Sequence, residues 1–213
     1  RVVVGAALDD VGSLSNSGSV FVYDLGGGTP ATPVLTLPNP TPNANDGFGF
    51  AVAMDGARVV VSAPSDDATA VQCGIAYVFD IDGPTPLLPV ATLQNPSPSI
   101  GDQFGERLAI SGTRVAVGAP FESGQGRVYL FDVSGPIPNV ITVPNPNPTP
   151  APGTLFNFGF SVAISPTRLA VGTYGSTGTM TDGSVVVYDI TGASPSLLFT
   201  LVDPNPGPQQ PKE

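Results

Sequence analysis

Short runs of apolar residues recur along the chain, and each complete run follows the dipeptide Phe-Gly. The dipeptide occurs at Phe48-Gly49, Phe104-Gly105 and Phe158-Gly159, so the period is about 55 residues. An arginine stands ten residues after each Phe, and a Val-rich run comes directly after that arginine. The chain begins with the same arginine and Val-rich run but without the Phe-Gly lead. A period of this length, built from short apolar runs, predicts a repeat architecture.

The residues that follow each Phe-Gly alternate strictly between larger and smaller side chains, over 48–54, 104–110 and 158–164. A period of two predicts a β-strand, which we term strand A. In the first copy its small face carries Gly49, Ala51 and Ala53. Such a face predicts close approach by another backbone, as for the innermost strand of a propeller. We expect the aromatic residues of strand A to form the core between blades: Phe48, Phe50, Phe104, Phe158 and Phe160.

Three further segments complete each copy. Strand B (59–64, 115–120, 169–174) is apolar on both faces, as a strand buried between two layers should be. Strand C (19–24, 75–80, 127–132, 184–189) is β-branched and aromatic, and it ends in Asp each time. Strand D (34–37, 90–93, 140–143, 198–201) is flanked by proline, which predicts an outer edge strand.

Four antiparallel strands in each repeat predict an all-β fold, a β-propeller of about four blades whose first blade lacks its inner strand. The expected divisions are a partial blade at 1–45, blades at 46–100 and 101–153, and a blade with a Pro-rich tail at 154–213. The 26 Gly and 25 Pro residues lie between the apolar runs, which indicates turns. We expect one propeller domain within a longer chain. A neighbouring chain that donates strand A is the alternative.

Charge and composition exclude several functions. The net charge of −10 disfavours nucleic acid and anionic membranes as partners. The sequence has no run of 18 apolar residues, so we expect no membrane insertion. The chain has no His, the commonest general base and metal ligand, and no nucleophile triad, so we expect no enzymatic activity. Cys73 is the only cysteine, which rules out an intrachain disulfide. We interpret it as a structural or incidental thiol.

The segment Phe158-Gly-Phe-Ser-Val-Ala-Ile164, the following Arg168-Leu-Ala-Val-Gly172 and the tripeptide Gly118-Ala119-Pro120 resemble FG-GAP repeats. Such repeats form the blades of the integrin α-subunit propeller and occur in many bacterial secreted proteins. The resemblance implies a β-propeller in an extracellular or cell-surface setting, with a role in adhesion or ligand binding. Integrin blades carry a calcium loop between strands A and B. Here that link is three residues, Asp55-Gly56-Ala57 in one copy, so those calcium sites do not carry over.

The loops between strands B and C vary most in length and sequence (8–18, 65–74, 121–126 and 175–183). Variable loops on a rigid scaffold are the usual place for specificity. We therefore predict a ligand-binding role for their acidic residues: Asp9, Asp10, Asp66, Asp67, Glu122 and Asp182. Clustered carboxylates would also suit Ca²⁺, but no loop has enough oxygen ligands at a known spacing. A solvated acidic loop without a cofactor is the preferred interpretation.

Two other sets of charged residues recur with the blades. An arginine lies between strands A and B in each copy: Arg1, Arg58, Arg114 and Arg168. These arginines would form either a cationic ring that binds an anion or contacts to the adjacent blade. We prefer the contacts, because a structural contact should recur with the blade. The aspartates that close strand C are expected to form Asx turns with the following backbone: Asp24, Asp80, Asp132 and Asp189.

These patterns leave three hypotheses for function. The first is a non-enzymatic extracellular module that recognises a protein or glycan through its B–C loops. The second is a structural subunit that assembles with copies of itself into a surface filament or coat. The third is a propeller domain appended to a secreted enzyme.

Overall fold

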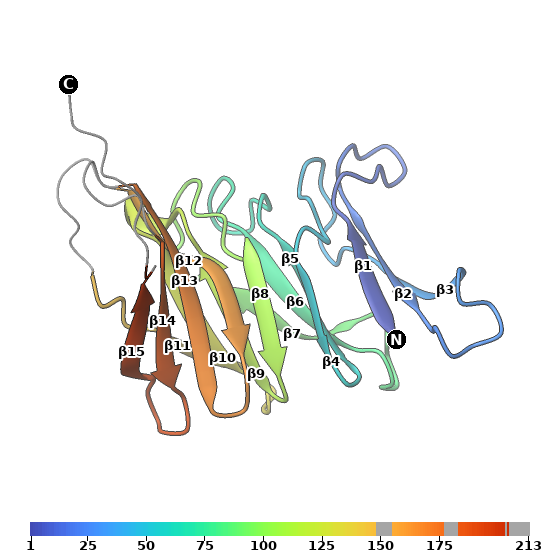
Figure 1. The fold of residues 1–213 in the computed structure, drawn as a ribbon. Coiled ribbons are helices and arrows are strands. Elements are labelled where there is room, and N and C mark those ends of the chain that lie inside the picture. Colours follow the sequence, from blue (N-terminus) through green and yellow to red (C-terminus); the bar gives the residue numbers. More distant parts are fainter. Residues whose placement is uncertain (148–154, 177–182, 203, 205–213) are drawn as a thin grey trace.

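The chain forms four antiparallel β-sheets that stand side by side in sequence order (Figure 1). The computed structural model describes residues 1–147, 155–176, 183–202 and 204. The first sheet has three strands and each of the other three has four. The predicted all-β fold of four-stranded blades, with the first lacking strand A, is confirmed. No helix among the described residues is long and apolar enough to cross a membrane.

Each sheet forms one blade, with the strands in the predicted order. Blade 1 contains β1 (Val2–Ala6), β2 (Ser19–Tyr23) and β3 (Pro33–Leu37). Blade 2 contains β4 (Val52–Asp55), β5 (Arg58–Ala63), β6 (Ile75–Asp80) and β7 (Pro89–Gln94). Blade 3 contains β8 (Arg107–Ser111), β9 (Arg114–Ala119), the short 3₁₀ helix η1 (Glu122–Gly124), β10 (Arg127–Asp132) and β11 (Asn139–Thr142). Blade 4 contains β12 (Leu155–Ile164), β13 (Arg168–Ser176), β14 (Ser184–Asp189) and β15 (Ser196–Val202).

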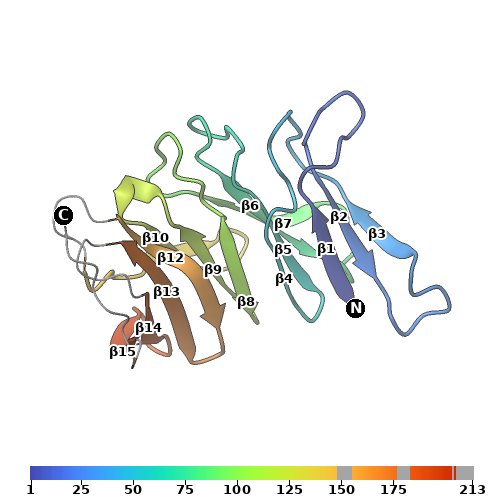
Figure 2. The ribbon, with the colours of Figure 1, turned by 45° about the horizontal axis from the view of Figure 1, so that its top comes forward.

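Up-and-down strand order gives the array two different rims. One rim carries the B–C loops and the linkers that lead from each blade to the next, and we call it the loop rim. The other carries the A–B and C–D turns, and we call it the turn rim. The loops project at the top of Figure 1 and the turns at the bottom, and Figure 2 shows the same array from a tilted direction.

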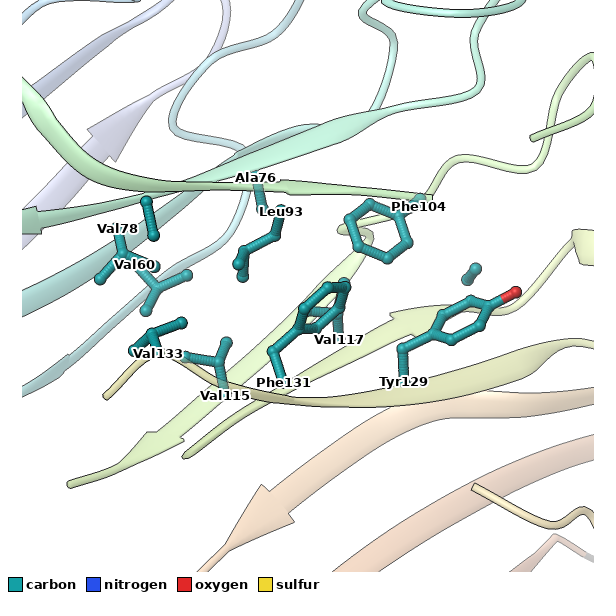
Figure 3. Packing of buried hydrophobic residues seen from close by; sticks show 12 residues of the cluster. Val60, Ala76, Val78, Leu93, Phe104, Val115, Val117, Tyr129, Phe131 and Val133 are labelled. Carbon is teal, nitrogen blue, oxygen red and sulfur yellow. The ribbon is translucent and has the colours of Figure 1, made fainter. Parts of the chain in front are cut away.

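The core lies between blades because alternate residues of each strand face opposite neighbours. In β5, Val59 and Val61 pack toward blade 1, while Val60 packs toward blade 3. Figure 3 shows the layer between blades 2 and 3, where Val60 and Leu93 meet Phe131. The B strands β5 and β9 are buried after their first residue, as predicted, whereas the edge strand β15 is exposed along its whole length.

Strand A begins later than its alternation predicts. Strands β4 and β8 start at Val52 and Arg107, after the Phe-Gly dipeptide. The cause is a left-handed backbone at the glycine, with φ of 91° at Gly49 and 92° at Gly105 and Gly159. In blade 4 the dipeptide lies within β12, but the pairing register shifts between Phe158 and Ser161.

The same turn corrects the expected core. Phe48, Phe104 and Phe158 are completely buried, but Phe50 is 50% exposed and Phe160 is 38% exposed, so the core prediction was wrong for these two. The left-handed glycine breaks the simple alternation of the strand, and the second aromatic ring therefore does not follow the first into the core.

The small residues of strand A allow the predicted close approach between blades. A Cβ placed on Gly5 of blade 1 would lie 1.9 Å from the carbonyl oxygen of Gly49 in blade 2. Two blades further on, a Cβ on Gly118 would lie 2.4 Å from the carbonyl oxygen of Gly159. Both positions leave no room for a side chain, because the neighbour is backbone.

The recurrent arginines make structural contacts at the turn rim. Arg1 forms an ion pair with Asp82 of blade 2 at 2.5 Å. Arg58 donates to the carbonyl oxygen of Gly112 in blade 3 at 3.2 Å, and Arg114 donates to that of Ile190 in blade 4. Arg168 pairs with Asp189 of its own blade at 2.7 Å. The preferred interpretation, contact with the adjacent blade, is confirmed for the first three.

The aspartates that close strand C form Asx turns in all four blades. Each accepts a hydrogen bond through Oδ1 from the backbone N–H two residues later, at 3.1 Å for Asp24, 3.2 Å for Asp80, 2.9 Å for Asp132 and 2.8 Å for Asp189. The prediction is confirmed, and these carboxylates define the C–D turns.

The substitution Gly118→Ala tests the backbone contact between blades 3 and 4. Gly118 does not require a positive φ, so a methyl group acts there through its contacts, chiefly the clash with the carbonyl oxygen of Gly159. We expect the free energy of unfolding to fall by about 1–3 kcal/mol, the usual cost of overpacking. Urea denaturation measures it. Gly28→Ala is the matched control, since nothing lies within 4 Å of its Cβ position. Equal stability of the two variants would contradict the close contact.

Candidate binding site at the loop rim

The Phe-Gly turn joins each blade to the B–C loop of the preceding blade. The backbone N–H of Phe48 donates to the carbonyl oxygen of Ser17 at 3.1 Å. The same bond runs from Phe104 to Cys73 at 3.0 Å and from Phe158 to Gln125 at 2.9 Å. In each case the acceptor stands directly before a glycine with positive φ, so the loop closes over the incoming turn. Cys73 is thus buried inside a loop junction.

The B–C loops of blades 1 and 2 are also closed on themselves. The N–H of Gly18 donates to the carbonyl oxygen of Asp9, and the N–H of Gly74 donates to that of Asp66 at 3.1 Å. Asp67 adds a side-chain bond, since its Oδ1 accepts from the backbone of Gln72 at 2.8 Å. These bonds hold the loops in fixed positions relative to the strands.

The linkers between blades are held by a second set of hydrogen bonds, which the sequence pattern did not reveal. Asn39 Oδ1 accepts from the backbone of Thr41 at 3.1 Å, while its amide donates to Asp46 Oδ2 at 2.9 Å. In the next linker Asn95 and Asp102 repeat the side-chain bond at 2.9 Å. The available signal was the sequence Asn-Pro-x-Pro with an Asp seven residues after the Asn, which occurs in both linkers.

Asp66 lies beneath the first of these linkers and is only 2% exposed. Thr41 of the linker donates to its Oδ2 at 3.3 Å, and the Thr41 hydroxyl is 2.7 Å from that of Tyr77. Burial, together with the nearby charge of Asp46, raises the pKa of Asp66 to about 6. Burial also raises the pKa of Asp46 above its ordinary value.

Glu122 occupies the corresponding place in blade 3 and is 1% exposed. Its Oε1 accepts from the Tyr129 hydroxyl at 2.8 Å and lies 3.0 Å from Nε of Arg127. Its Oε2 has no hydrogen-bond partner among the described residues. Burial raises the pKa of Glu122, and the carboxylate of Asp102 adds to that effect.

The predicted ligand-binding residues therefore fall into two groups. Asp9, Asp10 and Asp67 are exposed on the loop rim. Asp66 and Glu122 are buried in hydrogen-bond networks within their blades. Asp182 lies outside the described residues.

A hollow of about 460 Å³ opens beside the loop of blade 2, and we call it the blade 2 hollow. Its walls come from the linker at Pro40, Thr41 and Asn43 and from the loop at Asp66 to Ala68. Strand β6 contributes Ile75 and Tyr77, and the edge strand β7 contributes Thr92 and Gln94. Its size falls within the range of small-molecule sites.

The described residues contain no cluster of three or more Asp, Glu or Cys side chains that would hold a metal ion. Asp46 and Asp66 lie close enough to influence each other's charge, but they are already bonded to the linker. The loop rim therefore presents separated carboxylates together with neutral hydroxyl and amide groups.

Two stretches of the chain, residues 40–79 and 90–131, match the family model of the FG-GAP repeat. The first runs from the linker through strand C of blade 2, and the second runs from strand D of blade 2 through strand C of blade 3. The chain therefore contains FG-GAP repeats at these two stretches, in agreement with the resemblance of its Phe-Gly segments. Such repeats form propeller blades and are typical of extracellular proteins. No curated protein sequence matches the chain.

The raised pKa of Asp66 predicts greater stability in mild acid. The folded protein binds this proton below a pH of about 6, whereas the unfolded chain binds it only below about 3.9. Stability is then lost as the pH rises from 3.9 through 6. Between pH 5 and pH 7.5 the loss from Asp66 alone should be about 1.4 kcal/mol, measured by urea denaturation.

Asp66→Asn keeps the shape of the side chain but removes its titration, so this variant should show a smaller difference between the two pH values. The exposed Asp9→Asn is the matched control, because Asp9 does not contribute to the raised pKa of Asp66, and it should retain the full difference. A wild-type protein that is equally stable at both pH values would contradict the prediction.

Proposed function

We propose that this chain is a non-catalytic recognition module that works outside the cell and binds a protein or glycan through its loop rim. The observation that carries this proposal is the exposure of Asp9, Asp10 and Asp67 on loops that backbone hydrogen bonds hold in place. Groups held in position lose little conformational entropy when a ligand binds, which favours affinity. The FG-GAP match supports the extracellular setting.

The two buried acids support a non-catalytic role. A raised pKa is often a mark of catalysis, but structural networks produce the same shift. Asp66 is bonded to Thr41 of the linker, and Glu122 is bonded to Tyr129 and Arg127. Asp66 therefore joins the loop to the linker, and Glu122 joins the loop to strand β10.

The proposal is tested by removing charge from the rim while its hydrogen bonds are kept. The triple variant Asp9→Asn, Asp10→Asn and Asp67→Asn retains the Oδ1 acceptors that bond to Asn16 and Gln72. Surface plasmon resonance over immobilised extracellular-matrix proteins and an oligosaccharide array would measure binding. We expect the triple variant to lose at least tenfold in affinity for whichever probes the wild type binds, with an unchanged melting temperature.

Asp55→Asn is the matched control, because this exposed carboxylate lies on the turn rim and accepts from Gly112 at 2.7 Å. It should bind as the wild type does. A wild-type protein that binds no probe, or a turn-rim variant that loses binding while the triple variant does not, would overturn the proposal.

A second candidate function is a structural subunit that assembles with copies of itself. The exposed face of blade 4 favours it: a hollow of about 340 Å³ is lined by Gly172 and Gly183. In blade 3 the corresponding glycines, Gly118 and Gly126, receive the Phe158-Gly159 turn. Val185 and Leu201 are also exposed on this blade.

Self-assembly predicts particles whose sedimentation coefficient grows with protein concentration. Leu201→Glu places a charge on the exposed face and should reduce the growth, whereas Leu25→Glu, at an exposed turn of blade 1, should leave it unchanged. Sedimentation velocity measures both variants. A wild-type chain that remains monomeric at all concentrations would remove this candidate.

A further inference from the structure

The blade 2 hollow combines fixed and available polar groups from four separate segments. The fixed groups are the hydroxyls of Thr41 and Tyr77, which bond to each other at 2.7 Å and orient the floor. The available groups lie on the edge strand, where Thr92 and Gln94 are exposed. Within the described residues, their side chains form no hydrogen bond. A ligand in the hollow would therefore meet both hydroxyl and amide partners.

The linker and the loop supply further hydrogen-bond partners to the lining of the hollow. The amide of Asn43 donates to the carbonyl oxygen of Thr41 at 3.3 Å, which leaves its side-chain oxygen as an acceptor. Asp67 is exposed and uses Oδ1 to accept from the backbone N–H of Gln72, so its Oδ2 is a further acceptor. These acceptors line the same hollow as Thr92 and Gln94.

The charge of the lining limits the chemistry of the ligand. Asp66 and Asp67 line the hollow, and no Lys or Arg does within the part of the chain that the structure describes. An anionic ligand would be repelled, whereas a neutral or amine-bearing one would not. Pro40 adds apolar surface to the lining, and Ile75, which is 4% exposed, adds a little more.

A ligand with many hydroxyl groups, an apolar C–H face and no acidic group fits this lining, and these are the properties of a neutral or amino sugar. We propose that the blade 2 hollow binds the end of a neutral or amine-bearing oligosaccharide. The inference rests on the proposed recognition function and specifies one site and one ligand class for it.

Blade 3 supplies an internal comparison. Thr142 pairs with Tyr129 in the same way as Thr92 pairs with Tyr77. However, blade 3 has Pro144 where blade 2 has Gln94, and Ser123 where blade 2 has Asp67. The equivalent hollow of blade 3, of about 280 Å³, is lined by Glu122, Arg127 and Asn145, so it carries a cationic side chain that the lining of the blade 2 hollow does not.

The test uses three tetrasaccharide probes: neutral chitotetraose, its amine-bearing deacetylated form, and anionic tetragalacturonate. Isothermal titration calorimetry and saturation-transfer NMR would measure binding to the wild-type chain. We expect one or both of the first two probes to bind and the anionic probe not to bind. The double variant Thr92→Ala and Gln94→Ala should weaken binding at least tenfold, and Thr142→Ala should leave it unchanged.

The outcomes separate this inference from the proposed function. If neither non-acidic probe binds while the loop rim still recognises an immobilised protein, the sugar site is wrong and the recognition function stands. If a sugar binds equally well to the double variant, the blade 2 hollow is not its site. If the wild-type chain binds neither the probes nor any immobilised protein, both proposals fail.

Discussion

The structure depends on one backbone hydrogen bond, which runs from the Phe of each Phe-Gly turn to the B–C loop of the preceding blade. This bond fixes the position of each blade relative to the blade that precedes it. The left-handed glycine that follows turns the chain into strand A, and the buried Phe ring fills the core between the two sheets. A glycine is required there, because a side chain would meet the neighbouring blade.

The loop rim combines this junction with a buried acidic network. Asn39 and Asp46 close the linker, and Asp66 anchors it to the blade below. Burying carboxyl groups is costly unless they are hydrogen-bonded or neutralised, and here both occur as the pKa rises. The rim thereby gains a fixed shape while Asp67 beside it remains in water. Fixed acceptors next to an open hollow are a suitable arrangement for recognition.

The repeat period made the blade architecture predictable from the sequence, including the missing first strand and the proline-flanked edge strands. Local patterns also gave the Asx turns at Asp24 and its equivalents. The orientation of Phe50 was not predictable from alternation, because a single positive φ at Gly49 resets it. The burial of Asp66 was missed for another reason. Its partner Thr41 lies 25 residues away in the sequence, and Tyr77, which bonds to Thr41, lies 36 residues from Thr41. Only the folded linker brings the three side chains together.

The repeated Phe-Gly junction also affects how such a chain can change in length during evolution. Blades 1 to 3 present the same acceptor loop to the next blade, and blades 2 to 4 present the same turn to the blade before, so the three junctions are alike. Duplication of one whole repeat would preserve all existing junctions and add one more, whereas loss of half a repeat would leave a Phe without its loop. Selection should therefore favour gains and losses in whole units.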